Sequence, residues 1–276
     1  MKADVYNIDG NKSGSVDLPN QFNEPLRKDL IQRAFLAIRS NKKQPYGSYP
    51  KAGQRVSAKL SRRRRKFKGA YGKGISRSAR KTIWRRGSQF GWVGAFAPGT
   101  YKGRRAHPPK AYKDYSEKIN KKENKKAIRS ALGAVANENL VKERGHLIKN
   151  LPLIIDNKIY EIKKTKDLIK FLEKIGLENE LQRLKTRKVK AGQGSKRGRK
   201  YKNKKGPLFV IGKKNNVSKI LSSIRGIDCA LINNINVELL APGGVPGRLT
   251  LFTKDAIDVL KEKKLFENIK QEKKIK

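Results

Sequence analysis

The sequence predicts an α/β fold, in which a single globular domain with a largely parallel sheet flanked by helices carries a long extended internal loop. Beyond residue 116, short apolar runs alternate with segments of helical spacing, as in layered folds with parallel strands. Between residues 41 and 115 this periodicity disappears, and so long a stretch without it does not belong inside a compact domain. We therefore expect a discontinuous globular domain (1–40 and 116–262), an extended basic loop inserted between two helices (41–115), and a basic tail (263–276).

The amino-terminal residues predict a hairpin followed by a helix. Residues 3–8 alternate apolar and polar side chains, residues 9–11 supply a turn, and residues 15–18 return as a short strand. Pro25 stands where the first turn of a helix tolerates a proline. The apolar face of that helix consists of Leu26, Leu30, Ile31, Ala34, Phe35 and Ile38.

Helical spacing returns after the loop, and strands and helices then alternate toward the carboxyl end. The second helix is expected around Ala127, Ile128, Ala131, Leu132 and Val135. Strands are predicted at residues 151–155, 208–211, 228–232 and 248–252, and helices at residues 165–175, 217–224 and 253–260.

The positive charge is concentrated in two segments. Residues 30–113 contain 24 Lys or Arg, residues 181–227 contain 16, and neither segment contains an Asp or Glu. Together they supply 40 of the formal net charge of +45. Charge that is segregated in this way indicates contact with a polyanion. A solvated charged face is the alternative, but such faces usually intersperse both signs.

The sequence offers little support for an enzyme, a metal site or a secreted protein. The single Cys229 lies in an apolar run and cannot form an internal disulfide, and the amino terminus lacks the apolar stretch of a secretory signal. Without a membrane span either, we interpret the protein as soluble and intracellular. We expect His107 to lie in a turn or contact a phosphate, and His146 to end a helix. Three acids are expected to be surface charges on an exposed helix: Glu173, Glu178 and Glu180.

Cations and aromatic side chains are interleaved in the first basic segment, which favours a nucleic-acid partner. Residues 30–113 hold 11 of the 20 aromatic residues, including both tryptophans. Lys and Arg neutralise phosphates, whereas aromatic and guanidinium planes stack on unpaired bases. The candidate RNA-binding residues are Arg55, Arg62, Arg63, Arg64, Arg65, Lys66, Lys68, Lys73, Arg77, Arg80, Lys81, Trp84, Arg85, Arg86, Trp92, Lys102, Arg104, Arg105 and His107. A disordered basic segment is the alternative, although such segments are usually poor in aromatic residues.

The second basic segment carries glycines among its cations between residues 185 and 206, and it leads into the strand predicted at 208–211. We expect a glycine-rich loop at a sheet edge that clamps a folded RNA backbone without reading its bases. The candidate RNA-binding residues of this segment are Lys190, Lys196, Arg197, Arg199, Lys200 and Tyr201.

Several segments resemble one protein family, the universal large-subunit ribosomal protein number four in its archaeal and eukaryotic form. The longest are residues 190–201 (KAGQGSKRGRKY), 103–110 (GRRAHPPK) and 240–250 (LAPGGVPGRLT), and Arg248 in the last of them joins the candidate RNA-binding residues. Shorter similar segments lie at residues 6–11, 16–19, 43–47 and 129–132. Many relatives have a shorter, more glycine-rich loop centre, where this chain carries Arg62, Arg63, Arg64, Arg65, Lys66 and Phe67.

The resemblance implies a structural constituent of the large ribosomal subunit, and not an enzyme. Its α/β domain would lie on the subunit exterior, and its loop would thread through ribosomal RNA (rRNA) to form part of the polypeptide exit tunnel. The first implied partner is 23S rRNA, which the protein would bind early in assembly and across several rRNA domains. The other implied partners are neighbouring ribosomal proteins, including protein twenty-two at the tunnel constriction, and the nascent polypeptide. The implied location is the 50S subunit in the cytoplasm, with no membrane contact, homo-oligomer, cofactor or metal. The alternative is an extraribosomal RNA-binding regulator of its own expression.

Overall fold

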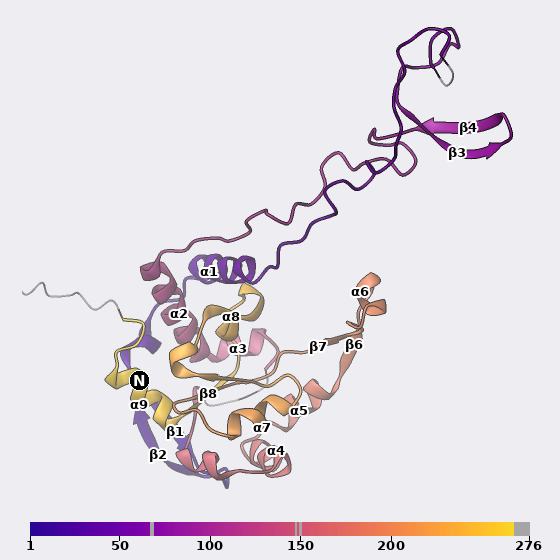
Figure 1. Ribbon diagram of the computed structural model, residues 1–276. Helices are drawn as coiled ribbons and strands as arrows, with labels where there is room; N and C mark the ends of the chain where they lie inside the picture. The colour runs from indigo at the N-terminus through magenta and orange to yellow at the C-terminus, as the bar shows by residue number, and fades with distance from the viewer. Residues whose placement is uncertain (67–68, 147, 149–150, 268–276) are drawn as a thin grey trace, which may run out of the picture. The chain divides into compact units, whose positions relative to one another are not determined.

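The computed structural model describes residues 1–66, 69–146, 148 and 151–267, and these residues form two compact units (Figure 1). The first combines Met1–Asn41 with the chain from Ser116 onward, and we call it the globular unit. The second is Lys42–Tyr115, which we call the excursion. In the described part of the chain, no helix has both the length and the apolar character that a membrane crossing requires.

The globular unit is built on a mostly parallel sheet, which confirms the predicted fold class. Within the described residues the strand order is β2-β1-β5-β10-β8-β9. The strands are β1 (Lys2–Tyr6), β2 (Lys12–Asp17), β5 (Leu153–Ile155), β8 (Leu208–Ile211), β9 (Asp228–Leu231) and β10 (Thr250–Thr253). Strands β1 and β2 form the antiparallel hairpin that the sequence predicted, and the other neighbouring pairs in this described sheet are parallel.

Strands β8 and β10, which are neighbours inside the described sheet, are buried on both faces. All four residues of β8 and all four residues of β10 are buried. Their side chains alternate between two hydrophobic clusters: Leu208, Val210 and Phe252 belong to one, whereas Phe209 and Leu251 belong to the other. Strand β8 (LFVI) accordingly carries a short uninterrupted apolar run, the pattern of parallel strands that are covered on both faces, whereas β10 (TLFT) has a threonine at each end.

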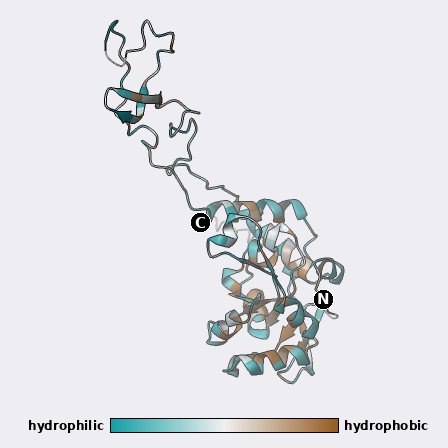
Figure 2. Ribbon diagram, turned by 90° about the vertical axis from the view of Figure 1, so that its right-hand side faces the viewer, coloured by the Kyte–Doolittle hydropathy of each residue, from teal (hydrophilic) through white to brown (hydrophobic). Residues whose placement is uncertain are grey.

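Amphipathic helices supply the rest of both clusters, and Figure 2 shows hydrophobic and hydrophilic residues along the same helices. Helices α1, α2, α8 and α9 contribute to one cluster, and helices α3, α4, α5 and α7 to the other. Their bounds are α1 (Lys28–Asn41), α2 (Lys121–Val135), α3 (Glu138–Glu143), α4 (Thr165–Lys174), α5 (Glu178–Lys185), α7 (Val217–Ser223), α8 (Val237–Leu240) and α9 (Lys254–Glu262). Single 3₁₀ turns are η1 (Asn20–Asn23), η2 (Asn157–Glu161), η3 (Ile232–Asn234) and η4 (Pro242–Gly244).

Helix α1 begins at Lys28, so the prediction that Pro25 lies in its first turn was wrong. The segment before the helix is instead bound to α2 through the buried hydroxyl of Ser130, which donates to the Pro25 carbonyl at 3.0 Å and accepts from the Arg27 amide at 2.7 Å. The predicted apolar face holds in the helix itself, where Ile31 and Ala34 are fully buried. A tertiary hydrogen bond to a distant helix therefore decides where α1 starts.

The excursion contains a hairpin that the sequence analysis did not predict. Strands β3 (Arg80–Arg86) and β4 (Gln89–Gly94) pair antiparallel, with a register shift between Thr82 and Trp84. The Trp84 indole lies over Gly91, where an added Cβ would come within 2.2 Å of its Nε1 atom. β-branched and aromatic residues on both sides of a Gly87–Ser88 turn are a recognisable hairpin signal, which the density of arginines obscured.

The second basic segment is an antiparallel ribbon, and not the predicted glycine-rich loop at a sheet edge. Strands β6 (Arg187–Val189) and β7 (Tyr201–Asn203) form a separate two-stranded sheet, with the short helix α6 (Gln193–Lys196) between them. We call residues 187–203 the basic ribbon. Strand β8, into which the chain continues, lies between β10 and β9, away from the sheet edges. Val189 is the only aliphatic residue in the two ribbon strands, so no alternating apolar pattern marked them.

We expect Phe252→Ala to lower the free energy of unfolding of the protein by about 3–5 kcal/mol, the usual range for removing a buried aromatic ring. Phe252 is fully buried in a central strand and packs edge-to-face on Phe22, with ring centroids 5.4 Å apart. Chemical denaturation measures the change. The matched control is Leu36→Ala, which shortens a side chain that is 51% exposed on α1 and should cost less than about 1 kcal/mol. Equal losses for the two variants would contradict the assigned core.

Candidate nucleic-acid interface

The basic ribbon brings together six of the predicted site residues. Lys190, Lys196, Arg197, Arg199, Lys200 and Tyr201 all lie in β7, in α6 or in the turns beside them, and all six are exposed. The two strands pair Arg187 with Asn203 and Val189 with Tyr201, and the Lys190 amide extends the ladder by donating to the Lys200 carbonyl at 2.7 Å. The ribbon is visible beside α5 in Figure 1, with β6, β7 and α6 labelled.

The ribbon presents cations beside an aromatic ring, with no acid in its own sequence. The Arg187 guanidinium lies 4.3 Å from the centroid of the Tyr201 ring, and the Lys200 ammonium lies 5.6 Å from it. Residues 181–227 contain no Asp or Glu that could neutralise these cations. Like charges held this close repel one another, and an anionic partner relieves the repulsion. A planar cation stacked on an exposed ring also suits contact with a nucleic acid.

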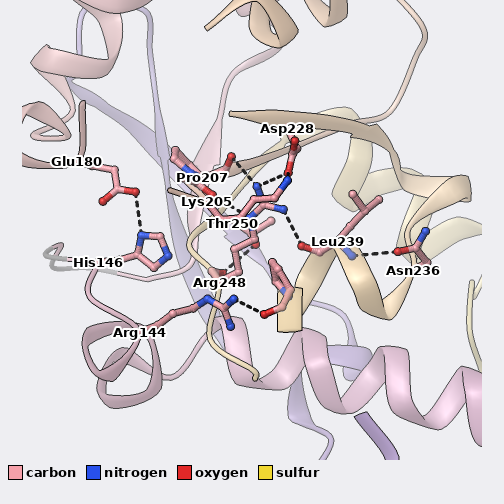
Figure 3. A network of polar contacts seen from close by, with 12 residues as sticks. Arg144, His146, Glu180, Lys205, Pro207, Asp228, Asn236, Leu239, Arg248 and Thr250 are labelled. Atoms are coloured by element: carbon pink, nitrogen blue, oxygen red, sulfur yellow. Dashed lines mark hydrogen bonds and ion pairs between the residues drawn. The ribbon is translucent and has the colours of Figure 1, made fainter. Parts of the chain in front are cut away.

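Two arginines fix the base of the ribbon to the globular unit. Arg183 on α5 donates to the Lys205 carbonyl at 2.7 Å, and Arg248 donates from Nε to the Gly206 carbonyl at 2.8 Å. Figure 3 shows Arg248 among its acceptors, which include the Leu239 carbonyl at 2.9 Å and the Asp228 carboxylate at 2.7 Å. The point where the chain leaves β7 and enters β8 is therefore held from the inside of the protein.

Arg248 was predicted to bind RNA, but its side chain is fully buried. Within the described residues, its guanidinium donates to three backbone carbonyls and to the Asp228 carboxylate. Burial would raise the pKa of Asp228, but hydrogen bonds from Lys205 and attraction to Arg248 together hold it below its usual value. The pair stays charged at neutral pH and links β9 to the segment just before β10. A buried arginine cannot be told from a surface arginine by its local sequence.

A buried pair lies beside the ribbon and corrects one further expectation. Glu180 was expected at the surface but is buried. His146 lies just past the end of α3, as expected, where its amide donates to the Val141 carbonyl at 3.2 Å. The His146 ring is also buried, and its Nδ1 atom lies 2.9 Å from the Glu180 carboxylate, which accepts a hydrogen bond from it. Glu180 also accepts two bonds from Arg183, at 2.5 and 2.8 Å. Burial would raise the pKa of Glu180, but the bonds from Arg183 and His146 outweigh it and lower the pKa. The same Arg183 thus connects the buried carboxylate to the ribbon base.

Arg144 is a third, half-buried arginine of this group, and its acceptors among the described residues are backbone carbonyls. It donates to the backbone carbonyls of Pro242, at 2.5 Å, and Val245. Burial and the neighbouring charges of Arg248 and Arg183 lower the pKa of Arg144 to about 10. The guanidinium still remains charged at neutral pH. The guanidinium groups of Arg144 and Arg248 therefore donate to backbone carbonyls inside the globular unit. Only part of the Lys and Arg content is then available to an external polyanion.

In the excursion, most of the predicted site residues lie at the surface. The exposed set is Arg55, Arg62, Arg63, Arg64, Arg65, Lys66, Lys73, Arg77, Trp84, Arg85, Arg86, Lys102, Arg105 and His107. The half-buried set is Arg80, Lys81, Trp92 and Arg104. Lys68, also predicted to bind RNA, lies outside the described residues. The structure thus presents a row of exposed cations over a segment with one acid, Asp114.

Two half-buried cations of the excursion, Arg80 and Lys81, stabilise its local structure by donating to backbone carbonyls. Arg80 donates to the Ser76 carbonyl at 2.7 Å and lies 5.5 Å from the centroid of the Trp92 ring. Lys81 donates to the Tyr101 carbonyl, which links β3 to the returning chain. The Trp92 ring also packs edge-to-face on Phe90, with centroids 5.6 Å apart. Trp92 therefore stabilises the hairpin, whereas Trp84 is 54% exposed and remains available to a partner.

Among the described residues, no group of three or more His, Cys, Asp or Glu side chains is placed to hold a metal ion. Burial raises the pKa of the Cys229 thiol to about 11, so this cysteine is a poor nucleophile at neutral pH. The arrangement can bind and position a polyanion, and it can do so through two separate cationic surfaces.

Comparison with known proteins gives matches over almost the whole chain. A sequence model described as "Ribosomal protein L4/L1 family" matches residues 16–263. A protein of Nanoarchaeum equitans named "Large ribosomal subunit protein uL4" is 48% identical over 96% of this chain and 100% of its own length. Proteins of the same name from Methanocaldococcus jannaschii and Sulfurisphaera tokodaii are 43% and 42% identical, each over 95% of this chain and over 99% and 94% of their own lengths.

We expect Arg248→Met to lower the free energy of unfolding by about 3–5 kcal/mol, because it leaves the Gly206 and Leu239 carbonyls without their donor inside the protein and takes away one of the two donors to Asp228, the other being Lys205. Denaturant unfolding measures this loss. The control is Arg199→Met in the exposed ribbon, which should change stability by no more than about 0.5 kcal/mol. A stable Arg248→Met protein with weakened RNA binding would instead make Arg248 an RNA contact.

Proposed function

The chain belongs to the ribosomal protein L4/L1 family, and from this premise we propose that it binds 23S rRNA directly, early in the assembly of the large subunit. As a member of this family it is a structural, non-catalytic constituent of the large ribosomal subunit in the cytoplasm. The observation that carries the proposal is the presence of two exposed cationic surfaces, the basic ribbon and the excursion, within segments that contain almost no acid.

The mechanism we propose is neutralisation of phosphates together with a fit of shape. Each phosphate that a Lys or Arg neutralises releases condensed counterions, and this release supplies most of the sequence-independent free energy of binding. The ribbon offers four such cations in five consecutive residues, Lys196, Arg197, Arg199 and Lys200 around Gly198. Its base is fixed by Arg183 and Arg248, so little ordering of the ribbon backbone is required when RNA binds.

The two surfaces belong to different compact units, which supports contact with more than one rRNA domain. We assign the ribbon to anchoring on the subunit and the excursion to the wall of the polypeptide exit tunnel. In that position the excursion would lie near ribosomal protein twenty-two and the nascent polypeptide. The exposed Ile83 and Trp84 of the β3–β4 hairpin are the side chains best suited to an apolar or stacking contact there.

We expect replacement of Lys196, Arg197, Arg199 and Lys200 by Gln to flatten the salt dependence of RNA binding. If each contacts one phosphate, the slope of log K against log salt should fall by roughly 3 units, at about 0.7–0.9 per phosphate. Titration of the full-length protein with an rRNA transcript at several salt concentrations measures the slope.

The matched control removes the same charge from another exposed surface. Lys163, Lys164, Lys166 and Lys170 lie in or just before α4 and are all exposed. Replacing these four by Gln should leave the slope within about one unit of the native value. Equal flattening in both variants would mean that net charge, and not the ribbon, determines binding.

A pair of deletions should separate anchoring from tunnel lining. Replacing residues 80–94 by a short Gly-Ser link removes the β3–β4 hairpin, which belongs to the excursion alone, so the globular unit should still fold. The variant should enter large subunits, and density should be lost at the tunnel wall. Replacing residues 192–201 by a similar link should instead reduce incorporation, measured by sedimentation of tagged subunits.

The opposite pattern would overturn this division of roles. Loss of incorporation in the hairpin variant, together with normal incorporation of the ribbon variant, would place anchoring in the excursion. Unchanged density at the tunnel in subunits that contain the hairpin variant would exclude the hairpin from the tunnel wall.

A further inference from the structure

Three tyrosines line a groove in the excursion that the sequence analysis did not identify. The groove has a volume of about 410 Å³. Its lining consists of Tyr46, Arg105, His107, Pro108, Pro109, Lys110, Tyr112, Lys113 and Tyr115. All of these residues belong to the one compact unit 42–115, and they come from its outgoing and its returning ends. The groove is therefore a product of the fold, because no single stretch of sequence contains it.

A glycine contact brings the two ends together. The Ser48 amide donates to the Pro109 carbonyl at 3.2 Å, and a Cβ added at Gly47 would lie 2.7 Å from the amide nitrogen of Ala111. Because Gly47 has no side chain, the backbones touch at this point. The residues that flank the contact, Tyr46 on one strand and Tyr112 on the other, then reach the same groove.

Two of the three rings expose most of their surface. Tyr112 is 79% exposed and Tyr46 is 60% exposed. The Tyr115 ring is half-buried, and the ammonium groups of Lys43 and Lys113 lie 4.2 and 5.3 Å from its centroid. Exposed rings that the protein itself leaves largely uncovered are costly in water, and a planar apolar partner would cover them.

The charge of the groove restricts the partner to one that is anionic. Arg105, Lys110 and Lys113 contribute three cations to the lining, and none of its described residues is an Asp or Glu. Lys110 lies 5.4 Å from the centroid of the Tyr112 ring, so a cation and an exposed ring stand side by side. A proline-rich peptide would also fit an aromatic groove, but it would leave these cations without partners.

We propose that this groove binds one unpaired nucleotide of RNA, with its base stacked on Tyr112 and Tyr46 and its phosphates beside Arg105, Lys110 and Lys113. The inference rests on the proposed function and deepens it, since it adds a site for a single flipped-out base to a surface otherwise suited to the RNA backbone. A base within a duplex is stacked on its neighbours and does not offer its face to a side chain, so the groove selects single-stranded RNA. Its volume is within the usual range of small-ligand sites, and it is too small for a helix.

The test compares single-stranded RNA, duplex RNA and heparin as probes of the full-length protein. We expect the double variant Tyr46→Leu, Tyr112→Leu to bind a fluorescein-labelled ten-nucleotide oligouridylate roughly 5- to 150-fold more weakly, the range of one base–aromatic stack. Affinity for a ten-base-pair RNA duplex and for heparin should change less than twofold, and the salt slope should stay the same. Fluorescence anisotropy measures all three.

Two further variants serve as controls. Tyr46→Phe, Tyr112→Phe keeps both rings and should retain native affinity for the oligouridylate. Tyr101→Leu removes a tyrosine that is 62% exposed beside Lys81 and Lys102 but does not line the groove, and it should also bind normally. The substituted side chains are exposed, so circular dichroism should show a native fold in every variant.

The outcomes separate this inference from the proposed function. If the native protein binds neither RNA probe, the proposed function fails. If it binds both, but the Leu double variant matches the native protein or loses no more than Tyr101→Leu does, the nucleotide site alone is overturned. An equal loss of affinity for oligouridylate, duplex and heparin would also overturn it, because the rings would then be acting on the cationic surface as a whole.

Discussion

The bonds from Arg183 and Arg248 to the backbone carbonyls of Lys205 and Gly206 are the interactions on which the cationic ribbon depends. A ribbon of two three-residue strands has too few apolar contacts to fix its own orientation, so its base must be held by the globular unit. The two arginines are in turn held by carboxylates, Arg183 by the buried Glu180 and Arg248 by the half-buried Asp228. The cationic ribbon is thus supported by ion pairs that are largely shielded from solvent.

The same residue type performs two different tasks in this protein, and burial decides which. Arginines inside the globular unit are neutralised by carboxylates or bound by carbonyl oxygens, as at Arg248 and Arg144. Arginines in the excursion and the ribbon have aromatic rings as neighbours, as at Arg55 over Tyr49 and Arg187 over Tyr201. Ring contacts are weak at exposed sites, so a phosphate can replace them at little cost.

The described residues of the excursion belong to neither hydrophobic cluster, and local contacts hold their structure. Its hairpin depends on Trp84 lying across Gly91 and on Arg80 binding the carbonyl of Ser76. Where its two ends meet, Gly47 allows the backbones to touch. Such contacts fix positions locally, and the resulting grooves carry rings and cations but no buried apolar layer.

The sequence by itself determined the fold class, the parallel strands and the two segments of segregated positive charge, because apolar periodicity and charge are local properties of the chain. The family resemblance was also confirmed along almost the whole chain. Tertiary structure alone decided that Arg248, Glu180 and His146 are buried, that Pro25 precedes α1, and that Tyr46 and Tyr112 share a groove. Burial and the meeting of distant backbones depend on residues far apart in the chain, and no local pattern encodes them.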